Sequence, residues 1–590
     1  MNYSIADKYL LTASFRADGS SVFGANNKWG YFPSLSVAWR ASEEKFIRNL
    51  NIFHDQKFRA SWGTTGNQGI APYQTFGVVR SSSDYNYPYN GTDQTDIGFL
   101  ITNSANPSLF IMKHVFYIAI LAMALFTIAS SCNKSLTETP ISFVSPDQFY
   151  TSPEQVEAAY AASMGQLWNK YGGYSDPFGA VFVNDDQSYG GDLVISSNFG
   201  DEAWRIHYVA LRNINAALEA IQKGSLTGTS QEVIDELVGQ GKFLRSFNYF
   251  MLVRMFGDVP LIKEETPDPS VTAIARSPIA DVYALIDADL TEAIAKLPDT
   301  WAGKPGRPTK GTAQGMLAKV YLTMATAPLN LTENYAKAAA LALQVMQAGI
   351  YHLEQDVHDL FQVNNKYGSE MMWSFNSNGQ DLSTPPQAHT PGFLNGWGGG
   401  AVEPAFEQSF PSQPRKNAYL LFEYNGLPYT DVSWSPDNFP FCQKFINVSS
   451  DDFAAFRSTV NLPILRYADV LLIYAEAKNM ANGSPTQDAV DAINEVINRA
   501  NGYVNNPDEP LLTTGLSKQA FDDAVLQERS WELCFENDRW FNLVRKRIVK
   551  EKNPLYQQNF TDDDYLFPIP ELDLRLDKLL TQNRGYPLPQ

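Results

Sequence analysis

A short apolar segment in the interior of the chain limits what the whole sequence can fold into. Residues 112–114 (Met-Lys-His) precede the uncharged run 115–128, and small residues at 129–131 lead to Cys132. A basic start, an apolar run and small residues before a cleavage point are typical of a secretory signal peptide. The run is shorter than the roughly 20 residues that cross a bilayer comfortably, so a transmembrane helix is the weaker interpretation, and a buried core helix is the other alternative.

The cysteine directly after the small residues makes residues 112–131 resemble a bacterial lipoprotein signal peptide. The resemblance implies that Cys132 is acylated and becomes the first residue of the mature protein. Ala129 stands where such signals more often carry leucine. Because signal peptides act at N-termini, we expect Met112 to be the authentic start of the mature protein's precursor.

Residues 1–111 carry the period of two that is typical of β-strands. The apolar members of two such alternations are Leu35, Val37 and Trp39, and then Phe58, Ala60 and Trp62. This pattern gives each strand one apolar and one polar face. It suits the strands of an outer-membrane barrel and equally those of a soluble antiparallel sheet, so the period alone does not separate the two.

Three motifs in this part resemble a SusC-like TonB-dependent outer-membrane transporter, and the resemblance covers roughly residues 5–109. They are FRADGSSVFG at 15–24, KWGYFPS at 28–34 and RASWGTTGNQ at 59–68. The resemblance implies that residues 1–111 are a partial β-barrel fragment. A few strands cannot close a barrel, and an open edge in lipid leaves backbone groups unsatisfied. We therefore expect this fragment to transport nothing.

Residues 132–590 are predicted to be mainly helical, because apolar residues recur at helical spacing. The stripes are Val156, Tyr160, Met164 and Leu167; Leu211, Ile214, Leu218 and Ile221; Leu237, Leu244, Phe247 and Met251; Leu285, Ile286, Leu290, Ile294 and Leu297. Two helix–turn–helix pairs are predicted, 313–324 with 335–346 and 467–477 with 489–497, without a strict repeat. Residues 168–203 and 350–465 are predicted to be long loops, where functional residues tend to lie.

Several motifs in this helical part resemble the SusD/RagB family of nutrient-binding outer-membrane lipoproteins. They include GKFLRSFNYF at 241–250, LVRMFGDVPL at 252–261, GRPTKG at 306–311, LRYADVLLIYAEA at 465–477, RWFNLVR at 539–545 and QNRGY at 582–586. The resemblance implies a mainly α fold, with about four tetratricopeptide-like helix pairs carrying a loop-rich ligand-binding face. It also implies a surface lipoprotein of the outer membrane that captures a glycan for a SusC-like transporter.

Aromatic side chains in the predicted loops are the candidates for glycan binding, because sugar rings stack on aromatic faces while polar groups meet their hydroxyls. The aromatic candidates are Trp168, Tyr171, Tyr174, Trp397, Tyr429 and Trp434, with Asn395, Asp431 and Asp437 as polar partners. The alternative is that each ring fills space beneath a loop. Trp204, Trp373, Trp531 and Trp540 lie in periodic segments and are expected in the core.

Composition and motifs bear on the other classes of function. With 45 Lys and Arg against 64 Asp and Glu, the net charge of -19 argues against a nucleic-acid partner. No metal-binding, cofactor-binding or phosphate-loop motif is recognisable. Asp185 with Asp186, Glu528 with Glu532, and residues 562–564 are carboxylates that a glycoside hydrolase could use, yet a solvated or salt-bridged face is the favoured interpretation. A peptide-binding or protein-interaction scaffold remains the alternative to glycan capture.

Overall fold

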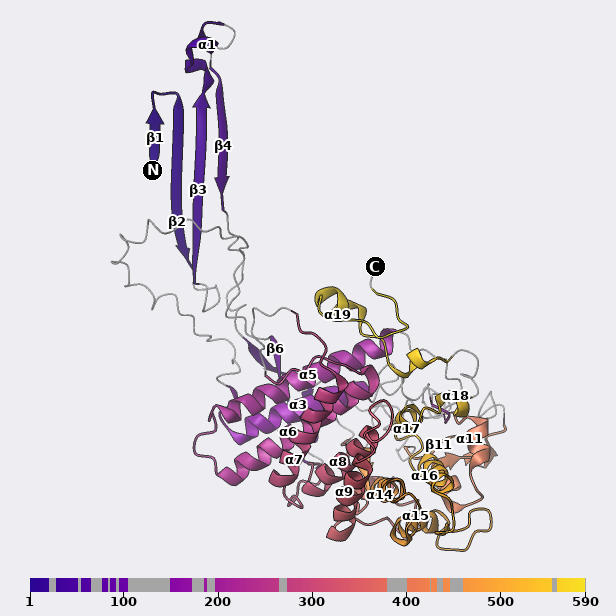
Figure 1. Ribbon diagram of the computed structural model, residues 1–590. Coiled ribbons are helices and arrows are strands. Elements are labelled where there is room, and N and C mark those ends of the chain that lie inside the picture. Colours follow the sequence, from indigo (N-terminus) through magenta and orange to yellow (C-terminus); the bar gives the residue numbers. More distant parts are fainter. Residues whose placement is uncertain are drawn as a thin grey trace. The chain divides into compact units, whose positions relative to one another are not determined.

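The computed structural model divides into two units, coloured along the sequence in Figure 1. The described residues are 1–20, 28–50, 55–64, 77–82, 85–91, 95–103, 149–171, 185–187, 197–264, 273–378, 401–424, 426–431, 439–445, 460–553 and 560–588. The sheet unit comprises Met1–Arg80, Ile101–Gln148 and Thr266–Val271; the helical unit comprises Ser81–Leu100, Phe149–Glu265 and Thr272–Gln590. The predicted signal segment 112–131 and Cys132 lie outside the described residues.

Four antiparallel strands form the sheet unit. They run in chain order across the sheet as β1 (Asn2–Ile5), β2 (Tyr9–Gly19), β3 (Trp29–Arg40) and β4 (Lys57–Gly63), with η2 (Ala41–Glu43) and α1 (Lys45–Arg48) between the last two. The register pairs Leu35 with Trp62 and Trp39 with Phe58, which confirms the predicted alternation. This apolar face is exposed within the unit, since Trp62 keeps 60% of its surface accessible.

The helical unit is built from long helices that pack in consecutive pairs. Their bounds are α3 (Pro153–Tyr171), α5 (Ser197–Gln222), α6 (Gln231–Phe256), α7 (Ile279–Lys296), α8 (Lys310–Met324), α9 (Asn334–Ala348), α14 (Tyr467–Asn482), α15 (Gln487–Ala500) and α16 (Lys518–Glu532). Helix α3 packs on α5, α6 on α7, α8 on α9, and α14 on α15, while each pair also contacts the next one. This arrangement confirms the mainly α fold of about four helix pairs.

Local sequence signals explain the bounds of the two predicted helix–turn–helix pairs. Helix α8 begins after Thr309, whose hydroxyl accepts a hydrogen bond from the Thr312 amide at 3.1 Å. Helices α9 and α14 end at Gly349 and Gly483, which have φ angles of 64° and 85°. Glycine adopts this left-handed conformation without steric cost, so the chain can leave both helices at these residues.

Shorter elements surround the long helices. They are η5 (Val363–Asn365), α11 (Pro404–Ser409), α12 (Pro414–Tyr419), β8 (Leu420–Leu421), β9 (Glu423–Tyr424), β10 (Leu427–Pro428), β11 (Phe441–Cys442), α17 (Arg539–Lys546), α18 (Val549–Lys552), η8 (Asp562–Tyr565) and α19 (Glu571–Leu576). Strands β8 and β11 pair with each other, as do β9 and β10. A separate two-stranded sheet joins β5 (Val78–Ser81) and β6 (Phe99–Asn103).

A two-stranded ribbon runs through the interior of the helical unit. Strand β7 (Met371–Phe375) pairs antiparallel with β12 (Leu462–Arg466), and most side chains of both strands are buried. Trp373 on β7 meets Phe243 and Phe247 of α6 edge-on, with ring centroids 4.7 and 5.0 Å apart. The ribbon thus supplies aromatic side chains to the core of the first helix pairs.

The predicted loop boundaries need correction. Residues 168–171 complete α3, and residues 197–203 begin α5, so both ends of the predicted loop 168–203 are helical. The stretch 350–465 also contains regular structure, because β7, α11 and α12 lie within it. Its glycine and proline content conceals these elements, which are short and therefore show little hydrophobic periodicity.

Three of the four tryptophans expected in the core are buried there. Trp204, Trp373 and Trp540 are each at most 4% exposed. Trp531 is only half-buried, because it lies on the outer side of α16 and its indole nitrogen donates to the Ser409 hydroxyl at 3.0 Å.

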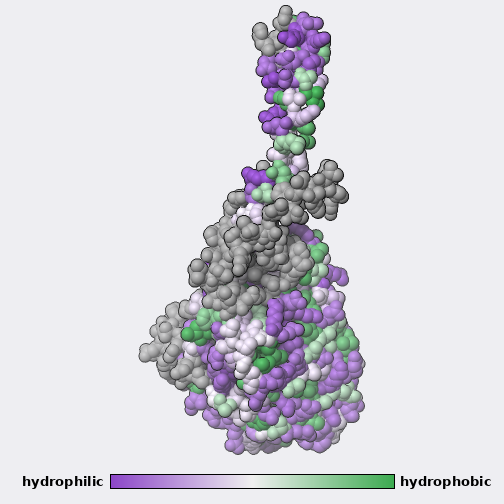
Figure 2. Space-filling view, turned by 90° about the vertical axis from the view of Figure 1, so that its left-hand side faces the viewer, coloured by the Kyte–Doolittle hydropathy of each residue, from purple (hydrophilic) through white to green (hydrophobic). Residues whose placement is uncertain are grey.

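Hydrophilic side chains predominate on the face of the helical unit that Figure 2 presents, with hydrophobic ones in small groups between them. Within the described residues, no helix has both the length and the apolar character needed to cross a membrane.

Candidate functional site

Two of the predicted ligand-binding residues lie together on a small hairpin. Tyr429 and Asp431 directly follow strand β10, and both are half-buried. The Tyr429 amide donates to the Phe422 carbonyl at 2.8 Å, and the two rings meet edge-on with centroids 5.8 Å apart. Tyr429 also packs against the buried pair Leu421 and Phe441. One side of its ring is therefore held by the hairpin.

The same hairpin exposes further apolar surface. Tyr424 on β9 is 36% exposed and Leu427 on β10 is 45% exposed. The amide of Asp431 donates to the Pro428 carbonyl at 2.9 Å, which fixes the turn that follows β10. An aromatic and aliphatic surface next to a carboxyl group is chemically suited to the C–H face and hydroxyls of a sugar.

Trp168 does not lie in a loop as predicted. It is the fourth residue from the end of α3, is 3% exposed, and stacks on Phe375 of β7 with ring centroids 5.4 Å apart. Its indole therefore belongs to the aromatic core, which was the alternative for each candidate ring. The side chains of Tyr171, Tyr174, Asn395, Trp397, Trp434 and Asp437 lie outside the described residues.

The described ends of the loop-rich stretches meet on one part of the helical unit. The Gln187 side chain donates to the Ser530 carbonyl at 2.8 Å, and the backbone carbonyl of Gln187 accepts from the Glu403 amide at 2.8 Å. Ala401 forms a β-bridge with Phe441. Segments from both predicted loop regions, 168–203 and 350–465, are thus anchored to each other and to the end of α16.

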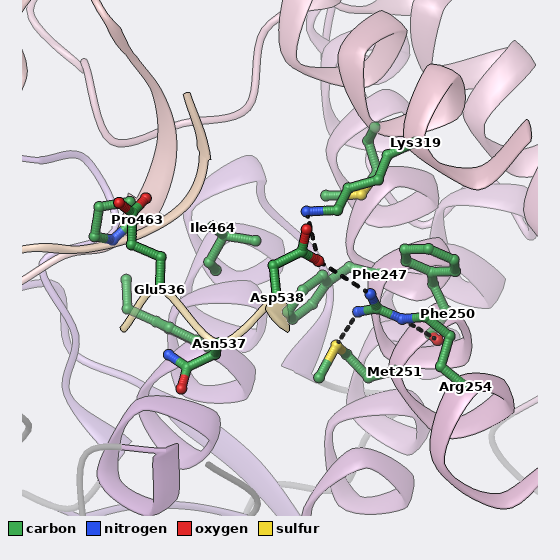
Figure 3. Close-up of a pocket in the computed structure, with 12 residues that line it drawn as sticks. Phe247, Phe250, Met251, Arg254, Lys319, Pro463, Ile464, Glu536, Asn537 and Asp538 are labelled. Atoms are coloured by element: carbon green, nitrogen blue, oxygen red, sulfur yellow. Dashed lines mark hydrogen bonds and ion pairs between the residues drawn. The ribbon is translucent and has the colours of Figure 1, made fainter. Parts of the chain in front are cut away.

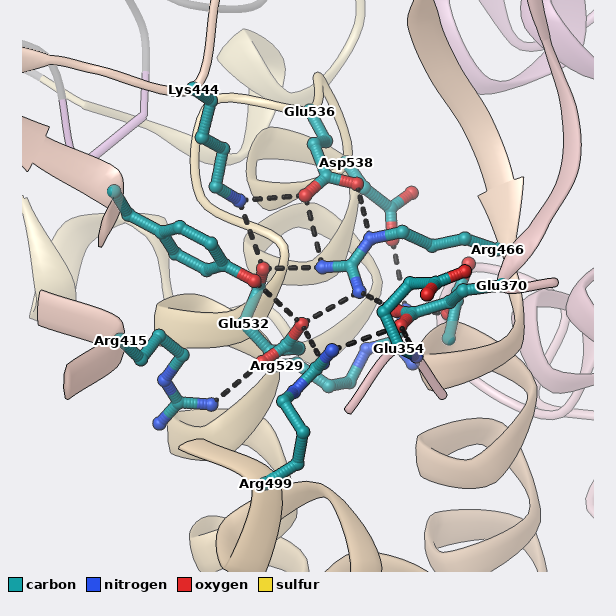
Figure 4. Close-up of polar contacts among 12 residues, drawn as sticks. Glu354, Glu370, Arg415, Lys444, Arg466, Arg499, Arg529, Glu532, Glu536 and Asp538 are labelled. Atoms are coloured by element: carbon teal, nitrogen blue, oxygen red, sulfur yellow. Dashed lines mark hydrogen bonds and ion pairs between the residues drawn. The ribbon is translucent and has the colours of Figure 1, made fainter. Parts of the chain in front are cut away.

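A buried ionic network lies beneath these anchors (Figure 4). Its four cations are Arg415 of α12, Lys444, Arg466 of β12 and Arg499 of α15, and its four main anions are Glu370, Glu528, Glu532 and Glu536. All of these side chains are at most 5% exposed. Equal numbers of opposite charges allow each buried ion to be paired, which such groups require.

Glu532 is at the centre of this network. Its carboxylate lies 2.6 Å from guanidinium nitrogens of both Arg466 and Arg499 and accepts from the Tyr419 hydroxyl at 3.0 Å. Burial alone would raise its pKa, but Arg499, Arg466 and Arg415 outweigh burial and hold the pKa of Glu532 well below its usual range. Glu532 is therefore ionised and fully committed to structural contacts.

A fifth carboxyl group borders the network without a cation of its own. Glu509 lies 3.4 Å from Arg415, which already pairs with Glu528 and Glu532. Burial, followed by repulsion from Glu528, raises the pKa of Glu509 to about 8. The excess carboxyl group is accommodated by retaining its proton near neutral pH.

Most of the carboxylates considered for hydrolysis are occupied by the scaffold. Glu528 and Glu532 belong to the ionic network, and Asp186 binds Arg539 through two contacts of 2.6 and 2.7 Å. Asp185 accepts from the Gln187 amide at 2.8 Å. In the segment 562–564, Asp564 accepts from the backbone and hydroxyl of Thr561. Each contact fits a structural role.

One cavity between α6, α8 and the ribbon measures about 30 Å³ (Figure 3). Asp538 borders it and lies 2.9 Å from Lys319 and 3.6 Å from Arg254, whose guanidinium stacks between Phe250 and Phe541. This space matches about one water molecule and is too small for a sugar ring.

A larger cavity of about 300 Å³ lies where α6 ends and α7 begins, beside α17 and the C-terminal segment. Arg276 donates there to the Asn583 side chain at 2.6 Å, and Arg547 stacks on Tyr565 at 3.9 Å from the ring centroid. Its volume is at the lower limit for a small-molecule site. The sequence hypotheses did not include this cavity, although the motifs at 252–261 and 582–586 contribute to its wall.

The comparisons with known proteins agree with this architecture. Residues 416–586 match a family model described as "SusD family", and residues 148–322 match one described as "Starch-binding associating with outer membrane". SusD-like protein P2 of Formosa agariphila is 28% identical over 495 residues, which cover 76% of this chain and 96% of that protein. A solved SusD superfamily protein from Parabacteroides distasonis is 25% identical, with a TM-score of 0.64 over 73% of this chain and 99% of that one.

A different segment matches transporters. TonB-dependent receptor P26 of Formosa agariphila is 45% identical over 109 residues, which are 18% of this chain and 10% of that receptor. The chain thus spans about a tenth of this relative's length. The SusD family itself is made of non-catalytic binding proteins that belong to carbohydrate uptake at the outer membrane. With a helical unit of this fold and two matching family models, the chain belongs to the SusD/RagB family, and a segment of about 100 residues in it matches SusC-like receptors.

Proposed function

We propose that the mature protein captures a glycan at the cell surface and delivers it to a partner SusC-like TonB-dependent transporter. Membership of the SusD/RagB family is the observation that carries this proposal. A lipid on Cys132 would hold the protein on the outer membrane, which fits the order of basic, apolar and small residues before that cysteine.

Within this proposal, glycan binding involves no covalent step. The hairpin that carries Tyr429 and Asp431 supplies a ring and a carboxyl group, and the exposed Tyr424 beside them extends the surface. Tyr171, Tyr174, Asn395, Trp397 and Trp434 are further proposed contacts from the same loop-rich stretches. A surface of this kind recognises a sugar by stacking and hydrogen bonding.

Calorimetry of the full chain against a panel of soluble polysaccharides tests the proposal. We expect micromolar binding of one glycan, and a loss of at least about tenfold in affinity for Tyr429→Ala, since stacking on an aromatic ring supplies a large share of such binding. Tyr503→Ala is the matched control, because Tyr503 is an exposed tyrosine outside the predicted loops.

Absence of heat with every glycan would overturn the proposal and favour a peptide-binding scaffold. Release of reducing sugar during the titration would instead indicate a hydrolase. Equal loss of affinity in Tyr429→Ala and Tyr503→Ala would show that the hairpin is not part of the glycan-binding site.

A further inference from the structure

One segment of the transporter-like part packs into the helical unit. Residues 81–100 lie within the range that resembles a SusC-like transporter, roughly 5–109, yet Ser81–Leu100 groups with the helices. Within it, residues 85–91 and 95–100 contact α3, α6, Asn376 directly after β7, and the turn before α8. Its hydrogen-bond partners Gln240 and Asn376 are 151 and 289 positions away from Tyr89 and Tyr87 in the sequence.

Two buried tyrosines anchor this segment. Tyr87 is 1% exposed, and its hydroxyl oxygen accepts from the Asn376 amide at 2.7 Å. Tyr89 is 2% exposed, and its hydroxyl donates to the Gln240 side chain at 2.9 Å. Tyrosines with a buried ring and a paired hydroxyl are the side chains that dominate binding energy at protein interfaces.

Arg307 fixes the next residue of the segment. Its guanidinium donates to the Asn90 side chain at 2.7 Å, lies over the Tyr89 ring at 5.6 Å from the centroid, and pairs with Glu157 at 2.7 Å. The Gly306 amide donates to the Asn90 carbonyl at 3.2 Å. Arg307 is 2% exposed, so these contacts form in a desolvated setting where they discriminate strongly between partners.

The two surfaces fit without spare room. A Cβ atom on Gly91, whose φ is 71°, would lie 2.4 Å from the Gly306 nitrogen. A Cβ atom on Gly306 would lie 2.3 Å from the Asn376 side-chain nitrogen and 2.7 Å from the Gly91 nitrogen. Backbone therefore packs on backbone, and any side chain at either glycine would push the segment away.

The segment also holds its own shape. Tyr87 and Asp96 form an antiparallel bridge with two hydrogen bonds of 3.1 Å, and the Asp96 carboxylate accepts from the amide and side chain of Asn90 at 3.1 and 2.7 Å. A loop that is ordered internally loses less conformational entropy when it binds, which favours docking of the loop as a unit.

We infer that the surface formed by Gln240, Gly306, Arg307 and Asn376, here called the docking surface, is where a separate SusC-like transporter binds. The occupant would be the transporter's own counterpart of residues 85–100. This inference rests on the proposed function for the identity of the partner. It also means that the transporter-like segment of this chain blocks its own docking surface, because a tethered copy competes at a high effective concentration.

A labelled synthetic peptide of residues 84–100 provides the probe, and its fluorescence anisotropy reports binding to the full chain. We expect no binding to the unaltered chain, whose docking surface is filled. Tyr87→Ala combined with Tyr89→Ala weakens the internal segment and should allow the peptide to bind. Adding Gly306→Val to that double variant should weaken peptide binding at least tenfold, since the new side chain meets the Gly91 backbone.

Gly515→Val, added to the same double variant, is the matched control because a Cβ atom there approaches nothing closer than 3.5 Å. Failure of the peptide to bind a double variant with an unchanged helical circular dichroism signal would overturn the inference. A dimer of the unaltered chain that dissociates in the double variant would also overturn it, by showing that a second copy is the partner.

Hydrogen exchange keeps the inference testable if the double variant does not fold. Tyr87→Phe removes only the hydroxyl that accepts from the Asn376 amide, so that amide should exchange several-fold faster while the Gly306 amide is unchanged. If the Asn376 amide is not protected from hydrogen exchange in the unaltered chain, residues 85–100 do not occupy the docking surface, and the inference is contradicted. Glycan calorimetry on the same variants separates the two proposals. Absence of peptide binding together with retained glycan binding would refute the docking surface and leave the proposed glycan capture standing.

Discussion

The core of the helical unit around the early long helices α3 and α6 differs in kind from the core around the late long helices α15 and α16. Around α3 and α6, the buried contacts are mainly between aromatic rings, such as Trp168 with Phe375 and Phe247 with Trp373. Around α15 and α16, fully buried arginines bind fully buried glutamates. Both regions bury large side chains, and Arg245 of α6 also forms a buried pair with Asp289, but the dense cluster of matched opposite charges lies in the second region.

This difference determines how each region responds to change. An aromatic core loses stability in proportion to the contacts and volume removed, and neighbouring side chains can relax toward the gap. A buried ion has no such compensation, because its partner keeps a charge that water no longer solvates. The ionic region should therefore be the more sensitive to a single substitution.

Arg466→Met should produce the largest loss of stability. The substitution leaves Glu370, Glu532 and Glu536 without the guanidinium that lies 2.6 to 2.8 Å from each of them. Breaking a buried ion pair from one side costs about 3–5 kcal/mol of unfolding free energy. Denaturant unfolding followed by the helical circular dichroism signal measures this change.

Arg575→Met is the control for that experiment, because the Arg575–Glu571 pair has side chains that are 56% and 55% exposed. Exposed pairs contribute about 0–1 kcal/mol. Similar losses for Arg466→Met and Arg575→Met would show that the buried network does not stabilise the fold.

His207→Gln should remove a pH dependence of the unfolding free energy in mild acid. This dependence arises from His207, which lies in the aromatic region. Burial lowers the pKa of His207 to about 4, although a hydrogen bond to Asn248 opposes this shift. Between pH 6.5 and 4 the unfolded chain binds a proton that the native histidine does not, so the unfolding free energy falls as the pH falls. The contribution of His207 to this loss is about 3 kcal/mol over the range.

The difference between the unaltered chain and His207→Gln isolates this effect, measured by denaturant unfolding at several pH values. Glu532 of the ionic region behaves differently, because its lowered pKa means that its contribution to stability falls only when the pH drops below the ordinary glutamate pKa of 4.5. Parallel stability curves for the two proteins from pH 6.5 to 4 would contradict the assignment of this dependence to His207.

Phe247→Leu should have the smallest effect of the three, about 2 kcal/mol. The leucine keeps the site apolar, but it removes edge-to-face contacts with Trp373 and leaves some volume unfilled. Leu572→Ala serves as the control for loss of apolar volume, because Leu572 is 65% exposed and should change the stability by less than about 0.5 kcal/mol. A larger loss for Phe247→Leu than for Arg466→Met would reverse the comparison.

The sequence predicted the helices well but did not predict the ionic network, and both outcomes have physical causes. Stripes such as the one through Leu237 and Met251 repeat at the helical period, so each helix can be predicted from its own segment of the sequence. The ionic network joins residues as distant as Arg415 and Glu532, and no local pattern connects them. Trp168 was predicted to lie in a loop, whereas its ring packs in the core on a strand some 200 residues later.

The β7–β12 ribbon ties the two kinds of core to one element. Trp373 lies among the aromatic rings, and Arg466 at the end of the paired strand enters the ionic network. In a helical repeat protein, each repeat touches only its neighbours, and the ends can unfold separately. Here a shared ribbon couples both ends, so the helical unit should unfold in one cooperative transition, with the same midpoint reported by probes at either end.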